Sequence, residues 1–79
     1  MLSQDAYQAA YHRFRMKLRQ ARLEAKLTQG QVAQQLGRPQ SFVSKMEAGE
    51  RRVDFVELQI LARLFDKQFS FFIDEELEN

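Results

Sequence analysis

The chain has 79 residues, about half the length of a typical single domain, so we expect one small domain over residues 1–79. It contains no cysteine and one histidine, His12, which excludes disulfide scaffolds, thiol nucleophiles and zinc sites built on cysteine or several histidines. The net charge of +1 hides an asymmetry, because residues 1–53 carry ten basic and four acidic side chains, whereas residues 54–79 carry two basic and seven acidic ones.

The sequence carries no signal for a membrane, an export route or catalysis. No apolar run approaches the roughly 20 residues that span a bilayer, and the N-terminus lacks the basic start and apolar stretch of a secretory signal. There is no Ser/His/acid set, metal cluster or phosphate-binding glycine loop. We therefore expect a cytoplasmic non-enzyme with no cofactor and no membrane partner.

The first predicted helix begins near Ser3, a good N-cap residue. An apolar stripe at spacings of three and four follows it, which is typical of an amphipathic helix. Its members are Tyr7, Tyr11, Phe14, Leu18, Ala21 and Ala25. The stripe indicates a helix face that packs on a core, and the alternative is a coiled-coil seam between two copies.

The four Gly and Pro residues all lie within residues 30–49, and the flanks contain none. A second helix is expected from the capping-box pattern of residues 28–31 to Gly37, and a third over residues 40–48, ended by Gly49. Two short helices joined by a glycine-containing corner are typical of a helix-turn-helix, here residues 28–48, whose second member can enter a DNA major groove.

The C-terminal part predicts two more helices, within residues 54–78, that serve the core and a dimer contact. Asp54 begins a helix, and the side chains it should bury are Leu58, Leu61, Ala62 and Phe65. Ser70 would cap a short last helix with Phe71, Phe72 and Ile73, followed by the acidic residues Asp74, Glu75, Glu76 and Glu78. No strand-like alternation occurs, so the expected fold class is all-α with five helices.

The third helix has two different faces. Its polar or small stripe consists of Ser41, Ser44, Lys45 and Ala48. Val43 and Met46 lie on the other side, with Phe42 at the edge. A helix that reads base edges needs an apolar back and a front of short hydrogen-bonding side chains, although an ordinary amphipathic surface helix has the same pattern.

One pair of charges falls on buried positions. Glu47 lies on the apolar side of the third helix, and Arg22 lies within the apolar stripe of the first. Because an unpaired buried charge is expensive, we expect the two to form an ion pair that locks these helices together. The alternative is that both side chains extend to water.

Residues 18–73 resemble the Xre/Cro-type helix-turn-helix regulators, the group that includes phage repressors. The motifs that carry the resemblance are Leu18-Arg19-x-x-Arg22, Leu27-Thr28-Gln29, Val32-Ala33 with Leu36-Gly37, Val43-Ser44-Lys45-Met46-Glu47-x-Gly49, and Leu58 to Leu64. The resemblance implies a five-helix, lambda-repressor-like DNA-binding domain, here with an extended first helix.

The resemblance also implies roles for individual residues. The positions of Gln40, Ser41, Ser44 and Lys45 match base-reading positions, and glutamine and lysine can recognise adenine and guanine. Gln29 matches a glutamine that contacts a phosphate and braces the reading helix, and Arg22 with Glu47 matches an interhelical ion pair. Arg51 and Arg52 suit phosphate contacts, with a solvated side chain as the alternative for each.

Three positions depart from the family pattern or stay open. Gly30 stands where the family usually has a good helix former. The one physical reason we find for glycine there is close approach to DNA or to a neighbouring helix. Glu50 is acidic where many members are basic. Phe42 either closes the edge of the core or touches a thymine methyl group.

These observations predict a sequence-specific double-stranded DNA-binding regulator, a repressor that binds a palindromic operator as a homodimer. The alternative is an antitoxin-type module that binds a partner protein and regulates its own operon, which the acidic, Phe-rich segment 65–78 suggests. In either case we expect association with the nucleoid through DNA. The basic surface should comprise the first helix, the helix-turn-helix and residues 51–52, with the acidic end held away from DNA.

Overall fold

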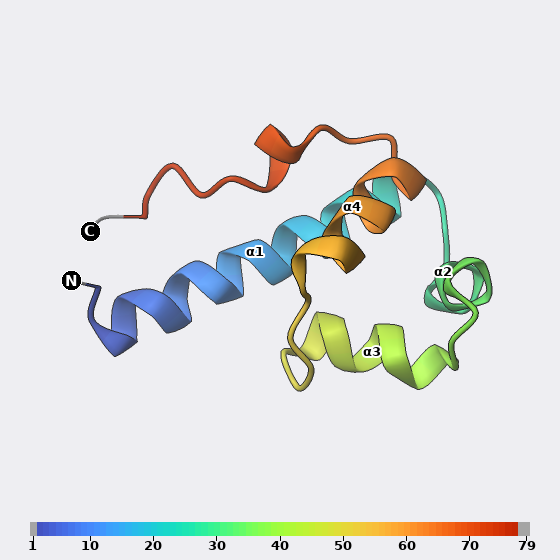
Figure 1. Cartoon of the computed structure of the whole chain (residues 1–79), viewed down its shortest axis with the longest axis horizontal. Coiled ribbons are helices and arrows are strands. Elements are labelled where there is room, and N and C mark those ends of the chain that lie inside the picture. The colour runs from blue at the N-terminus through green and yellow to red at the C-terminus, as the bar shows by residue number, and fades with distance from the viewer. Residues whose placement is uncertain (1, 78–79) are drawn as a thin grey trace.

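The computed structural model describes residues 2–77, which are helical and contain no strand (Figure 1). Four α-helices are followed by one short 3₁₀ helix. Their bounds are α1 Gln4–Glu24, α2 Gln29–Leu36, α3 Gln40–Ala48, α4 Phe55–Leu64 and η1 Phe69–Phe72. The all-α prediction is confirmed, whereas the prediction of five helices is wrong in its last member.

Local chemistry sets the helix ends at the predicted places. The Ser3 hydroxyl accepts a hydrogen bond from the Ala6 N–H at 3.1 Å, and capping boxes begin α2 at Thr28 and α4 at Asp54. Gly37 and Gly49 end α2 and α3 with φ of +67° and +82°, in the left-handed region that glycine adopts without a steric penalty.

The core lies between α1 and the three helices that follow it. Its buried side chains are Leu18, Ala21, Val32, Ala33, Val43, Met46, Leu61, Ala62, Phe65 and Phe72. The predicted burial of the α1 stripe is correct from Phe14 onward but wrong for Tyr7, which is 43% exposed. The reason is the length of α1, whose N-terminal half extends beyond the other α-helices (Figure 1).

The segment after α4 does not form the predicted α-helix. Residues 69–72 make one turn of 3₁₀ helix with Gln68 at the N-cap position, so Ser70 lies inside the turn and is not its cap. A single tight turn is enough to bring Phe72 into the core, where its ring lies 6.3 Å from that of Phe14. Phe65 is also buried and Phe71 partly so, which means that much of the Phe-rich segment completes the core. Glu78 lies outside the described residues.

Candidate nucleic-acid interface

The helix α3 presents a polar face to solvent and an apolar face to the core. Val43 and Met46 are only 1% and 2% exposed. The exposed positions include all four residues predicted to read bases, namely Gln40, Ser41, Ser44 and Lys45. Because α2 packs against α3 without covering this face, its row of hydrogen-bonding side chains is available to a ligand.

A polar network fixes α3 to α1 and α2. The Arg22 Nε lies 2.6 Å from one carboxylate oxygen of Glu47, and its Nη2 lies 3.1 Å from the other, so the two side chains form a bidentate pair. Arg22 also donates to the Leu27 carbonyl at 2.9 Å, and the Gln29 side chain donates to Glu47 at 3.0 Å. Gln29, the predicted phosphate contact, therefore has its amide nitrogen directed toward α3.

Arg15 holds the C-terminal end of α3, a role that the sequence analysis missed. Its Nη1 donates to the Glu47 carbonyl at 3.0 Å, one of the last carbonyls of the helix, which lack partners within the helix itself. A Cβ atom on Gly49 would lie 2.8 Å from the Arg15 guanidinium, so this contact depends on glycine. The available signal was the seven-residue spacing to Arg22, which places both arginines on one face of α1.

Arg51 is bound within the protein. Its guanidinium donates to both carboxylate oxygens of Glu57, at 2.9 and 2.7 Å, and lies 4.1 Å above the centre of the Phe42 ring. The hydrogen bonds from Arg51 lower the pKa of Glu57 below its ordinary range and raise the pKa of Arg51. Arg51 was predicted to bind a DNA phosphate, but two of its N–H donors instead bind Glu57 and link the loop after α3 to the first turn of α4.

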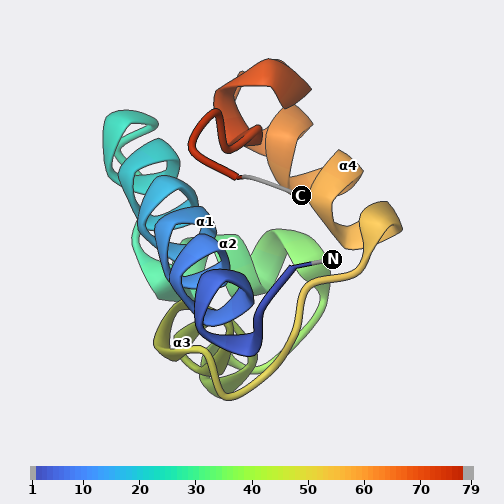
Figure 2. The same cartoon turned by 90° about the vertical axis from the view of Figure 1, so that its left-hand side faces the viewer.

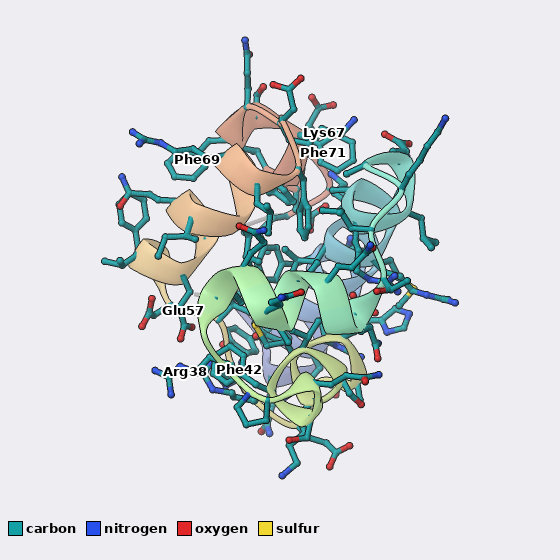
Figure 3. All side chains as sticks on the ribbon, turned by 90° about the vertical axis from the view of Figure 1, so that its right-hand side faces the viewer. Arg38, Phe42, Glu57, Lys67, Phe69 and Phe71 are labelled. Carbon is teal, nitrogen blue, oxygen red and sulfur yellow. The ribbon has the colours of Figure 1, made fainter. Side chains whose placement is uncertain are left out.

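Phe42 partly closes the edge of the core, and its ring contacts a second arginine as well as Arg51. It is half-buried, and the guanidinium of Arg38, in the turn between α2 and α3, lies 5.1 Å from its ring centre. Figure 3 shows Arg38 beside Phe42, with Glu57 of α4 above them. Arg38 was not among the predicted DNA-contact residues, although it lies four residues before Phe42 in the sequence.

Arg52 lies against the N-terminal half of α1. Its guanidinium is 5.1 and 4.7 Å from the ring centres of Tyr7 and Tyr11, and it donates to the Tyr7 hydroxyl at 2.6 Å. The Tyr11 hydroxyl accepts a hydrogen bond from the Val53 N–H. The first two members of the α1 stripe therefore stabilise the loop after α3, which explains why they lie outside the core.

The comparison with protein families supports this arrangement. A family model described as a helix-turn-helix domain matches residues 13–66, more than half of the chain. The chain belongs to the helix-turn-helix domain family. Neither a curated protein nor a solved structure matches it significantly. In DNA-binding helix-turn-helix domains the second helix of the motif enters the major groove, and α3 is the second helix of the motif in this chain.

The acidic C-terminal segment and the helix α3 lie on opposite sides of this helix-turn-helix domain. Figures 1 and 2 both place the C-terminal segment on the opposite side of the molecule from α3. Asp74 lies in that segment and accepts from Arg13 of α1 at 2.7 Å, which lowers the pKa of Asp74. Lys17 donates to the Ile73 carbonyl. The expectation that α1 as a whole belongs to the basic surface is therefore wrong, because Arg13 and Lys17 face the acidic end.

Residues 2–77 contain neither a membrane-spanning helix nor a metal site. No helix in this part of the chain combines the length and the apolar character needed to cross a membrane. Likewise, these residues contain no group of three or more histidine and carboxylate side chains placed to hold a metal ion.

Proposed function

We propose that this chain is a sequence-specific regulator of transcription of the Xre/Cro type, which binds double-stranded DNA through α3. The observation that carries the proposal is the exposed row of Gln40, Ser41, Ser44 and Lys45 on a helix whose position is fixed at several points. Glutamine and lysine can make hydrogen bonds to adenine and guanine edges, and serine suits a base or a phosphate.

The rigidity of α3 supports reading of sequence rather than charge alone. Direct readout needs donors and acceptors held in register with the bases, since each correct bidentate contact discriminates by about 1–3 kcal/mol. The bidentate Arg22–Glu47 pair and the Arg15 contact hold α3 from its buried side and its C-terminal end. A protein that needed only non-specific phosphate binding would not require such a fixed helix.

We further propose that two copies act together as a repressor on a palindromic operator. Two-fold symmetry would place the two α3 helices in successive major grooves about 34 Å apart. Apolar side chains left exposed on α4 support self-association: Phe55, Val56 and Ile60 are 64%, 60% and 48% exposed. The solution mass of the protein, compared with that of Ile60→Asp, tests the dimer, and a reporter with the operator inside a promoter tests repression.

The DNA-binding proposal is tested by selecting duplexes from a random pool with the purified protein. We expect an inverted repeat to be enriched, and binding to it to fall at least about tenfold in the Gln40→Ala plus Lys45→Ala double variant. The matched control is Gln20→Ala plus Lys26→Ala, which removes the same two residue types from exposed positions outside both the helix-turn-helix and α4.

Two outcomes would contradict the proposal. One is binding that ignores sequence, so that the selected pool stays random. The other is an enriched duplex whose affinity is equal in the α3 double variant and in the Gln20→Ala plus Lys26→Ala control. Affinities are compared at two salt concentrations, because phosphate contacts make binding depend on salt whereas contacts to base edges do so much less.

A further inference from the structure

The turn of the helix-turn-helix contains an arginine that is held in place by an aromatic ring. The Arg38 guanidinium lies over the Phe42 ring, with 5.1 Å between Cζ and the ring centre. Phe42 is half-buried and packs against the core, so the ring has little freedom. Contact with this ring restricts the Arg38 side chain, so less rotamer entropy is lost when the guanidinium binds a ligand.

The second arginine on the same ring differs from the first in its electrostatic environment. Arg51 lies 4.1 Å from the ring centre and is neutralised by a bidentate contact with Glu57. Arg38 is exposed and, among residues 2–77, has no acidic side chain within salt-bridge distance. Its charge helps to lower the pKa of Glu57, so that carboxylate is near both arginines. The two guanidinium groups therefore share one counter-charge, and the one that forms no ion pair with it is the exposed Arg38.

The position of Arg38 in the fold decides which ligand this charge can meet. It lies two residues before Gln40, the first residue of α3, and so borders the exposed face of that helix. When a helix enters a major groove, the segments next to it approach the phosphates that edge the groove. A guanidinium that lies over a ring can still donate its N–H groups to two phosphate oxygens.

We propose that Arg38 binds a DNA backbone phosphate from its place on the Phe42 ring, and that Arg51 is a positioning residue for that ring. This inference rests on the proposed DNA-binding function and changes one of its details, because it replaces Arg51 by Arg38 as a phosphate contact. Glu57 keeps Arg51 within the protein, where its bonds link the loop after α3 to the first turn of α4.

The test measures how the affinity for a selected duplex depends on salt in Arg38→Gln, Arg51→Gln and a control, Arg13→Gln. Arg13 is paired with Asp74 of the C-terminal segment, which lies on the opposite side of the molecule from α3 in Figure 1. The slope of log K against log salt is negative, and loss of one phosphate contact reduces its magnitude by about 0.9 per subunit. We expect that change in Arg38→Gln, together with a loss of affinity of about tenfold or more. The slopes of the other two variants should equal that of the wild type.

A double-mutant cycle tests the role of the ring. Leucine at position 42 keeps an apolar side chain at the core edge but removes the aromatic face, so Arg38→Gln should cost several-fold less affinity in Phe42→Leu than in the wild type. Melting temperatures of all variants are recorded, and the salt slope distinguishes a lost phosphate contact from a loss of folded protein.

The outcomes separate this inference from the function on which it depends. If no duplex is enriched by the wild-type protein, both fall together. If the wild type selects a sequence but Arg38→Gln keeps the wild-type slope, only the Arg38 assignment is overturned. A salt slope reduced in magnitude by about 0.9 in Arg51→Gln would show that Arg51 leaves Glu57 to bind DNA, which overturns the division of roles between the two arginines.

Discussion

Replacing Glu47 by glutamine removes the carboxylate that neutralises Arg22 while keeping the size of the side chain. The two partners are buried to a similar degree, with side chains only 9% and 11% exposed, so water cannot replace the lost charge. The substituted amide can accept through one oxygen but directs an NH₂ group toward the guanidinium donors. Arg22 keeps its bond to the Leu27 carbonyl, which satisfies one donor but supplies no counter-charge.

The expected loss of stability follows from these contacts. Removing one partner of a buried ion pair costs about 3–5 kcal/mol. We expect a value near 3 kcal/mol, because Arg22 retains one acceptor and slight exposure. For a chain of 79 residues this is a large part of a total stability of roughly 4–12 kcal/mol, and it corresponds to a fall in melting temperature of about 12 °C or more.

Thermal and urea denaturation of the purified variants provide the assay. The matched control is Glu50→Gln, which makes the same change at an exposed position three residues away and should stay within about 0.5 kcal/mol of the wild type. Replacing Arg22 and Glu47 together by methionine should recover most of the loss, since no charge is then left unpaired. The reasoning is refuted if Glu47→Gln melts within about 2 °C of the wild type.

Further predictions concern three glycines and the carboxylate of Asp74. Gly49→Ala should cost about 1 kcal/mol more than Gly37→Ala, because both residues have positive φ but only a Cβ at position 49 would displace the Arg15 guanidinium from its hydrogen bond with the Glu47 carbonyl; equal losses in denaturation would contradict this. Gly30→Ala should raise stability by roughly 0.5–1 kcal/mol, since its Cβ would make only ordinary contacts at 3.7 and 3.8 Å, and a lower melting temperature would show that the helix needs glycine there. The lowered pKa of Asp74 stabilises the fold above the ordinary aspartate value of about 3.9, and this contribution is lost as pH falls through the lowered value. The melting temperatures of wild type and Asp74→Asn should therefore differ at pH 7 and converge on acidification; a constant difference would argue against the ion pair.

The sequence was informative wherever structure depends on near neighbours in the chain. Capping at Ser3, Thr28 and Asp54 involves groups three residues apart, so the pattern of residue types predicted the observed helix starts. Burial of the α3 back followed from the helical period in the same way. The segment 69–72 was predicted less well, because an α-helix and a 3₁₀ turn share the same residue preferences over four residues.

The roles of the arginines could not be read from local pattern. Arg51 and Arg52 are adjacent, yet one contacts Glu57 and Phe42 while the other contacts the two tyrosines of α1. Long charged side chains have many rotamers of similar energy, so the partners brought near by the fold determine where their donors point. Arg38 was not predicted as a contact residue either, because its spacing of four residues from Phe42 does not by itself show that the two side chains meet across the turn between α2 and α3.

Sequence alone thus determined the four α-helices, the glycine-ended corner between α2 and α3, and which face of α3 is polar, because helical geometry and capping act over three or four residues. It also indicated the Arg22–Glu47 pair, since both charges fall on apolar faces. Tertiary structure decided which basic groups remain free for a ligand. The free energy of a charged side chain depends on every group within a few ångströms, and at Arg13, Arg15 and Arg51 those groups come from segments 61, 32 and 6 residues away.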